Sequence, residues 1–337
     1  MKTRRRWLMA LILIAGIVGS LGAAPHAAGS PQDASVIVSE AQHQFEAGNY
    51  SGAISTLQPL VSANSSNPDA YYWMGRSYYE LRDYDNSIAN LEKAVAISPK
   101  NSVYHDWLGR ADGGKADVDR SFSFARKVKK EFVTAVGLDA SNLQARRDLE
   151  EFTLDAPWIV GGNKDEALDQ ANAIANADPV SGHLARALYD REASKNNQQA
   201  ESEYQQVLEA KPTKLDPYFE VADFYIAQNQ PAGIENAIQA AAAISPTDSR
   251  IAFYRGVEGI LANHDLPDAE RDLKSYLAST PDRSDWPGHA TARVWLGRLY
   301  ELQGKAADAA EQYRAALQLN PRQKEARSRL DKLKGSQ

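Results

Sequence analysis

The chain has 337 residues, of which 24% are charged, a formal net charge of −6 and no cysteine. The absence of cysteine excludes disulfide bonds, cysteine chemistry and a lipid-modified N-terminal cysteine. An acidic balance disfavours binding to nucleic acid or anionic lipid, because both need surfaces rich in Lys and Arg. The length suits two ordinary globular domains or one extended array.

The first 28 residues have the three-part layout of a bacterial export signal. Basic residues at 2–6 precede an apolar run at 8–21, and small residues at 22–29 offer cleavage sites. The apolar run is shorter than the roughly 20 residues of a membrane-spanning helix. We therefore expect a cleaved signal peptide at 1–28 and a periplasmic protein, with a retained inner-membrane anchor or full secretion as alternatives. The arginine run resembles a twin-arginine signal, and the choice between that route and general secretion stays open.

Residues 29–36 are rich in Gly, Ser, Pro and Asp and predict a disordered segment. Residues 68–101 then predict two amphipathic helices joined by a short turn. Tyr71 and Tyr78 share one face of the first helix, and Leu91 lies on the apolar face of the second. Gly75 allows the two helix backbones to approach closely, and Pro99 ends the second helix.

The same pattern recurs along the chain. Prolines at 179, 212, 246 and 281 are 33 to 35 residues apart and predict the ends of successive units. Trp-Met-Gly-Arg occurs at 73–76, and Trp-Leu-Gly-Arg occurs at 107–110 and 295–298. A fixed period near 34 residues is typical of helical repeat arrays. The period and the residues resemble the tetratricopeptide repeat (TPR), and the unit at 290–323 fits this pattern best through Leu296, Gly297, Tyr300, Gly304, Ala309, Tyr313, Ala316 and Pro321.

The resemblance implies an all-α, right-handed α-solenoid of about eight TPR-like helix-turn-helix repeats at 37–323. We call the two helices of each repeat A and B. The expected repeats are 35–67, 68–101, 102–141, 142–180, 181–214, 215–248, 249–286 and 287–323, followed by a polar C-terminal capping helix at 324–337.

Two repeats depart from the pattern. The third has an excess of about seven residues near 111–119, and the fourth has an extra segment at 155–163 between its helices. We expect both insertions in the turns between helices A and B, and hence on the same edge of the solenoid. In the second insertion Trp158 is apolar where a turn should be polar. The segment either folds back onto the solenoid edge or forms a small partner-binding patch.

In TPR proteins helix A lines the concave groove, so the resemblance implies that helix A residues off the core face contact ligands. Tyr and Arg are enriched at binding hot spots. The alternative is that these side chains stabilise packing between neighbouring repeats, which we favour for the recurring Trp73, Trp107 and Trp295. The candidates for groove contact are Tyr72, Arg76, Tyr79, Arg110 and Arg298.

No catalytic motif stands out. The sequence contains no HExxH pair, GxSxG elbow or phosphate-binding GxxxxGK[ST] loop. His105 beside Asp106 is the least implausible start of a catalytic site, and a structural role is favoured for it. We therefore predict a non-enzymatic scaffold with no cofactor and no metal, which binds a protein or peptide partner and contacts a membrane only through an uncleaved N-terminus. The alternatives are an anchored assembly factor for an envelope complex, or an accessory domain of a cell-wall or polysaccharide-processing enzyme.

Overall fold

The computed structural model describes residues 31–279 and 281–335, and in this part of the chain every regular element is a helix. The first helices form four hairpins: α1 (Pro31–Glu46) with α2 (Tyr50–Ser62), α3 (Pro68–Glu80) with α4 (Tyr84–Ile97), α5 (Ser102–Asp119) with α6 (Phe122–Leu138), and α7 (Leu143–Asp155) with α8 (Lys164–Ala177). Four more follow: α9 (Pro179–Tyr189) with α10 (Asn197–Ala210), α11 (Asp216–Ala227) with α12 (Pro231–Ile244), α13 (Ser249–Ala262) with α14 (Leu266–Ser279), and α15 (His289–Leu302) with α16 (Ala306–Leu319). The last helix is α17 (Lys324–Gly335), and two short helical turns are η1 (Trp158–Val160) and η2 (Asp190–Ser194).

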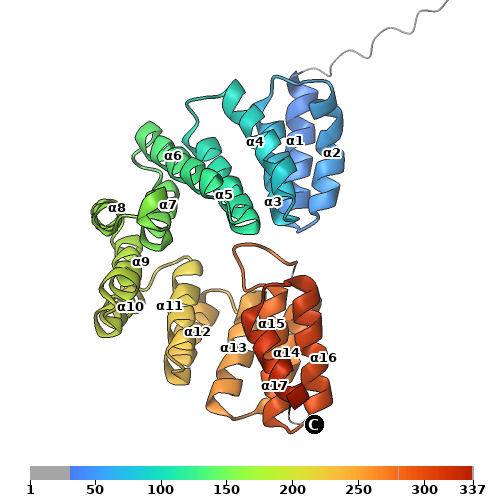
Figure 1. Cartoon of the computed structure of the whole chain (residues 1–337), viewed down its shortest axis with the longest axis vertical. Coiled ribbons are helices and arrows are strands. Elements are labelled where there is room, and N and C mark those ends of the chain that lie inside the picture. The colour runs from blue at the N-terminus through green and yellow to red at the C-terminus, as the bar shows by residue number, and fades with distance from the viewer. Residues whose placement is uncertain (1–30, 280, 336–337) are drawn as a thin grey trace, which may run out of the picture.

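The hairpins follow one another around a curve, so that the first and last repeats lie on the same side of the molecule (Figure 1). This arrangement is an all-α solenoid of TPR-like repeats and confirms the predicted fold class. None of the described helices is long and apolar enough to cross a membrane. The predicted signal peptide or anchor at 1–28 lies outside the described residues.

Polar residues fix where most of the helices begin. In each case a side-chain oxygen accepts a hydrogen bond from a backbone N–H of the first helical turn, which satisfies a donor that has no partner inside the helix. The residues that do this are Asn49, Asn67, Asp83, Asn101, Ser121, Asn142, Asn163, Asp178, Asn196 and Asp248.

Helices A and B of one hairpin pack closely, as the second repeat shows. A Cβ atom on Gly75 would lie 2.7 Å from Cγ of Leu91, so only glycine fits at this position of α3. Ser87 of α4 is fully buried beside it. The prediction that Gly75 permits close approach is confirmed.

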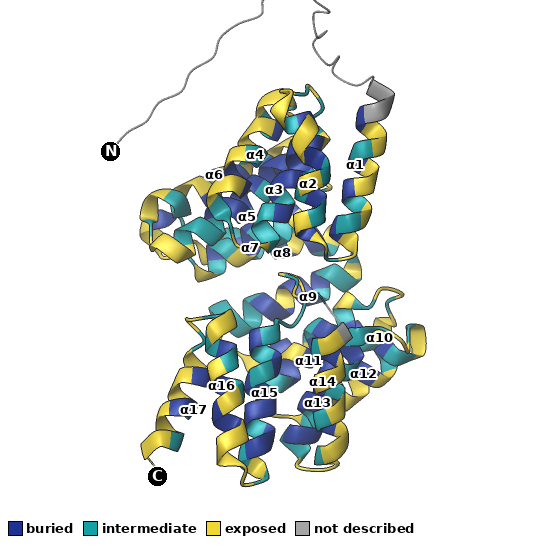
Figure 2. Cartoon of the chain, turned by 90° about the vertical axis from the view of Figure 1, so that its right-hand side faces the viewer, coloured by how far each residue is buried: buried dark blue, intermediate teal, exposed yellow. Residues whose placement is uncertain are grey.

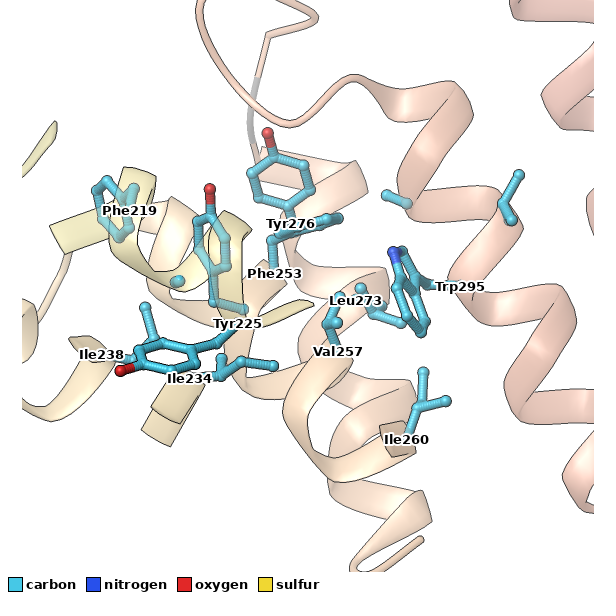
Figure 3. Packing of buried hydrophobic residues seen from close by; sticks show 14 of the residues in the cluster. Phe219, Tyr225, Ile234, Ile238, Phe253, Val257, Ile260, Leu273, Tyr276 and Trp295 are labelled. Atoms are coloured by element: carbon cyan, nitrogen blue, oxygen red, sulfur yellow. The ribbon is translucent and has the colours of Figure 1, made fainter. Parts of the chain in front are cut away.

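The apolar core differs between the two halves of the chain. One continuous cluster runs from Leu184 to Leu330 and includes Phe219, Leu273 and Trp295 (Figure 3). In the first half the core is divided into smaller clusters, and exposed residues alternate with buried ones along each helix (Figure 2).

Three predicted boundaries are wrong. Residues 31–36 belong to α1 rather than to a disordered segment, because Ala34 and Val38 continue the buried face of that helix. Pro179 begins α9 instead of ending the helix before it, since proline lacks the N–H that a first helical turn does not need. The excess near 111–119 is not a turn, because it extends α5 to Asp119.

Candidate partner-binding groove

The inner side of the curve is formed by the A helices. Each odd-numbered helix from α1 to α15 contacts the next odd-numbered one, whereas the B helices lie further apart on the outside. The prediction that helix A lines the concave surface therefore matches the packing. The A helices lie towards the interior of the curve (Figure 1).

Arginine and aromatic side chains alternate along the groove in the first three repeats. The guanidinium of Arg76 lies 4.7 Å from the ring centre of Trp73 and 4.1 Å from that of Trp107. It also lies 4.5 Å from the ring centre of Phe45 and donates a hydrogen bond of 3.3 Å to the hydroxyl of Tyr72. Burial raises the pKa of Tyr72. Stacked arginines of this kind hold neighbouring repeats together.

Arg110 continues this stack and connects it to the fourth repeat. Its guanidinium lies 4.8 Å from the Trp107 ring centre, and its Nε donates to Asp148 at 2.5 Å and pairs with Asp106 at 3.4 Å. Burial and the neighbouring Asp148 carboxylate raise the pKa of Asp106. Tyr79 packs edge-on against Trp107, with ring centres 5.6 Å apart. Arg110 is thus a partly buried cation between two carboxylates.

The structure brings four of the predicted groove residues into one cluster. Tyr72 is buried, and Arg76, Tyr79 and Arg110 are partly buried in contact with one another or with Trp107. Arg298 lies at the other end of the chain, where its guanidinium is 3.8 Å from the Trp295 ring centre and 3.8 Å from Glu325. Contact of these residues with a partner stays a prediction.

The open part of the groove is a cavity of about 610 Å³ in the second half of the curve. Arg250 forms one wall, where it stacks on Phe219 at 4.2 Å and Trp286 at 4.8 Å and donates to Asp216 at 2.6 Å. Trp295 forms another, close to the aromatic core in Figure 3. Sequence reasoning missed Arg250 and Trp286, because neither falls at a repeat-defining position.

The segment 281–288 closes the mouth of the groove. The backbone N–H and the hydroxyl of Ser284 each donate to the Glu80 carboxylate of α3 at 2.8 Å. The Tyr276 hydroxyl donates to the carbonyl of Pro287 at 2.5 Å. A second contact joins Arg322 to Asp117 at 3.0 Å, so the two ends of the solenoid meet. In the sequence, the only feature that indicates this segment is the extra length of the predicted seventh repeat, residues 249–286.

Several acidic side chains of α7 and α11 are buried or line a further cavity. Glu150 is fully buried, and its two oxygens accept no hydrogen bond from the described residues. Burial raises its pKa to about 8, and burial raises that of Asp223 to about 6. Arg147 of α7 reaches past α9 to pair with Glu220 of α11. A second cavity of about 310 Å³ is lined by Arg147, Glu151, Leu154, Asp155, Leu188, Arg191, Glu192, Glu220 and Asp223.

The surroundings of His105, the candidate start of a catalytic site, indicate a structural role. One ring nitrogen of His105 lies 2.6 Å from the Glu131 carboxylate and the other lies 3.1 Å from the carbonyl of Pro99, so both are occupied. Within residues 31–279 and 281–335, no group of three or more His, Asp or Glu side chains could hold a metal ion.

The insertion at 155–163 folds back onto the solenoid edge only in part. Val160 is buried, and Lys129 of α6 donates to the carbonyl of Gly161 at 2.9 Å and to Glu166 at 2.7 Å. Trp158 remains 84% exposed. The fold-back and the exposed apolar patch are therefore both present in this loop.

Comparisons with known proteins concern the repeats. Among solved structures, a tetratricopeptide repeat protein from Parabacteroides merdae is 14% identical, with a TM-score of 0.48 over 79% of this chain and 98% of the other. The Cut9-Hcn1 hetero-tetramer of the APC/C is 12% identical, with a TM-score of 0.49 over 91% of this chain and 57% of the other. A human IFIT1 dimer with m7Gppp-AAAA is 17% identical, with a TM-score of 0.47 over 85% of this chain and 72% of the other. No functional conclusion follows from these similarities.

No curated protein is similar to this chain at a significant level. The family model for the tetratricopeptide repeat matches residues 38–102 and 261–324, which include α2 to α4 and α14 to α16. The chain is therefore a TPR-like solenoid with recognisable tetratricopeptide repeats near both of its ends.

Proposed function

We propose that this chain is a non-enzymatic scaffold that binds a segment of a partner protein inside its curved groove. One observation carries the proposal. Side chains from α5, α7, α11, α13 and α15 surround a single cavity of about 610 Å³, together with the segment 284–287. An extended ligand in this place would contact several repeats at once, which is how solenoids obtain affinity from many small contributions.

Charge supports a protein ligand over a nucleic acid. The two groove cavities are lined by more carboxylates than guanidinium groups, and a phosphate backbone would be repelled. The carboxylates belong to Glu151, Asp155, Glu192, Asp216, Glu220, Asp223 and Asp285, and the guanidinium groups to Arg110, Arg147, Arg191 and Arg250. Arg250 and Trp295 provide the planar cation and aromatic surface that anchor side chains of a partner.

Site-specific photo-cross-linking tests this proposal. A photo-reactive residue is placed at Gln144, which is exposed on α7 and lines the groove cavity. The matched control places it at Glu92, which is exposed on the outer helix α4. We expect a discrete protein adduct from position 144 and none of the same mass from position 92. Adducts from position 92 alone, or the same adducts from both, would contradict groove binding.

We further propose that the protein works in the periplasm after loss of residues 1–28. The basic, apolar and small-residue regions of that segment support the proposal. N-terminal sequencing of the protein from fractionated cells tests it, and a new N-terminus near residue 29 in the periplasmic fraction is expected. A retained Met1 in the membrane fraction would instead favour the anchored assembly factor.

A further inference from the structure

A third cavity, of about 780 Å³, opens towards the edge of the solenoid and extends inward to Tyr79, Arg110 and Asp148 of the groove cluster. We call it the edge pocket. It lies between the α5–α6 hairpin on one side and α7 with the following loop on the other, in the green part of Figure 1. Both insertions build it, because it is lined by the extension of α5 up to Asp117 and by the loop residues Ala156, Pro157 and Val160. A regular repeat would lack both walls.

The walls of the edge pocket are mainly apolar. Phe132 and Val128 of α6 and Phe152 of α7 form the inner wall. Gly113 of α5 leaves one side open, since a Cβ atom there would meet only Val128, at 3.8 Å. The volume lies within the roughly 300 to 1,000 Å³ that is typical of ligand sites, so the pocket has room for a large apolar group.

The apolar surface continues beyond the mouth of the pocket. Phe122 lines the pocket and is 58% exposed. Trp158 and Ile159, next to Pro157 in the chain, are 84% and 49% exposed. Large exposed apolar side chains that border a cavity are typical of protein-binding surfaces. This continuity favours a segment of a protein over a small molecule that the cavity would enclose.

Carboxylates outnumber guanidinium groups in the lining of the same pocket: Asp117, Asp148, Glu151 and Asp155 against Arg110 and Arg120. Asp155 is the last residue of α7, at the negative end of the helix dipole, and the carboxylate of Glu192 also repels it. No basic residue lies in the last turn of α7. Glu151 pairs with Arg147 at 3.2 Å, but among the described residues Asp155 forms no ion pair or hydrogen bond, and Arg191 and Lys195 act on it only at longer range. A cation from outside would relieve this repulsion.

We propose that the edge pocket docks a basic amphipathic segment of a partner protein. A large apolar side chain of that segment fills the cavity beside Gly113, and a Lys or Arg side chain pairs with Glu151 and Asp155. The complementarity is of two kinds, apolar against the Phe-lined wall and cationic against the rim. The edge pocket shares Arg110 with the groove cavity and shares Glu151 and Asp155 with the carboxylate-lined cavity. Gly113 lines the edge pocket but neither groove cavity, so a substitution there tests this proposal apart from the groove interaction.

Selection from a library of random 12-residue peptides displayed on phage, with the full chain as bait, tests the proposal. Two variants probe the site: Gly113→Leu fills the cavity from an α-helix, and Glu151→Gln with Asp155→Asn removes the rim charge. The matched control is Asp169→Asn, an exposed carboxylate on α8. Circular dichroism and thermal melting establish that each variant is folded, and the charge variant remains informative if Gly113→Leu is not.

We expect the enriched peptides to combine a large apolar residue with Lys or Arg. Gly113→Leu should weaken their binding at least about tenfold, since it occupies the space that the apolar side chain needs. The charge variant should weaken it about fivefold at low salt and less at 0.5 M salt, because exposed charges are screened. Asp169→Asn should leave affinity within about twofold.

Two results would overturn the proposal. One is a selection in which every enriched peptide binds at least one of the two folded variants as tightly as wild type. A selection that enriches neutral or acidic peptides counts equally against the proposal. The other comes from n-octylamine, added as a small-molecule probe. If it binds wild type as tightly as the best peptide and is excluded by Gly113→Leu, the pocket is a small-molecule site instead of a docking site for a protein.

Discussion

The central repeats and the C-terminal repeats use the same hairpin but stabilise it differently. From α9 onward one continuous apolar cluster runs through the molecule, and Arg250 is the only charged residue that is buried in its described part. Between α5 and α7 the apolar clusters are small, and five ionisable residues are buried: His105, Asp106, Asp112, Glu131 and Glu150. Because each repeat contacts only its neighbours, one section of a solenoid can exchange apolar packing for charges and cavities while the rest stays intact.

The candidate sites are divided between the two regions. The edge pocket lies in the central repeats, the carboxylate-lined cavity lies between α7 and α9 to α11, and the groove cavity is lined mainly by the C-terminal repeats. Buried charge and empty volume cost stability. The continuous core of the C-terminal half therefore offsets the cost of the central section, where the edge pocket lies.

The largest expected effect comes from truncating one leucine in each region. Leu273→Ala in the C-terminal core should lower the free energy of unfolding by about 4 kcal/mol, because Leu273 is fully buried among close neighbours. Leu149→Ala in the small central cluster should cost about 2 to 3 kcal/mol, since its surroundings are looser. Urea unfolding followed by circular dichroism measures both. An equal or larger cost for Leu149→Ala would show that the two regions are packed alike.

Two arginines with the same side-chain exposure differ in their partners, because Arg110 pairs with two buried or nearly buried carboxylates and Arg298 pairs with an exposed one. Arg110→Ala leaves Asp106 and Asp148 facing each other without their cation and should cost about 3 kcal/mol. Arg298→Ala removes a stack on Trp295 at the periphery and should cost about 1 kcal/mol or less. Adding Asp148→Asn to Arg110→Ala should restore part of the loss. If the two single variants melt at the same temperature, Arg110 is not a structural cation and its role in partner binding gains weight.

Because several acidic side chains are buried, we expect the free energy of unfolding to be larger at mildly acidic pH than at higher pH. Glu150 keeps its proton up to about pH 8 in the folded chain, whereas the unfolded chain loses it near 4.5. Its contribution to stability is therefore complete below about pH 4.5 and declines as the pH rises towards 8. Burial also raises the pKa of Asp112 to about 7, and burial raises that of Asp223 to about 6, so both act in the same direction.

Glu150→Gln tests this reasoning because glutamine has the same shape and no charge. The loss of unfolding free energy between pH 5 and pH 8 should be about 2 kcal/mol smaller in the variant than in wild type. Glu311→Gln, at an exposed site on α16, serves as the control and should leave the pH profile unchanged. Identical profiles for wild type and Glu150→Gln would show that Glu150 is ionised in the fold.

The sequence predicts most of the fold because its determinants are local. The apolar spacing in residues 68–101, the capping residues and Gly75 act within one hairpin, and that hairpin recurs. The extension of α5 was mispredicted because glycine at 114 suggests a turn. In the structure Gly114 makes room for Tyr84, whose ring would lie 2.3 Å from a Cβ atom there. Packing between repeats thus overrides a local preference.

The sites were less predictable, because they depend on contacts between distant repeats. Arg76 and Arg110 occupy the same position on helix A of two successive repeats, so the repeat pattern predicts that they lie near each other. Nothing in the sequence indicates that Arg110 pairs with Asp148, since the pair spans an insertion. The contact between Ser284 and Glu80 depends on the curvature that accumulates over the five hairpins from α5 to α14. Small errors in the angle between repeats add up over such a distance.

The smallest expected effect on stability, and the largest on shape, comes from the contacts that close the curve. Glu80→Ala with Arg322→Ala removes the acceptor of Ser284 and the partner of Asp117. Exposed hydrogen bonds and surface ion pairs contribute little, so unfolding should change by about 1 kcal/mol or less. The two ends would no longer be joined, and small-angle scattering should show a larger radius of gyration. Glu92→Ala with Arg314→Ala, matched in charge and exposed on outer helices, should scatter like wild type. An unchanged scattering profile for Glu80→Ala with Arg322→Ala would contradict this expectation. It would mean that core packing alone sets the curvature, and that the contacts of segment 281–288 are not needed to keep the two ends together.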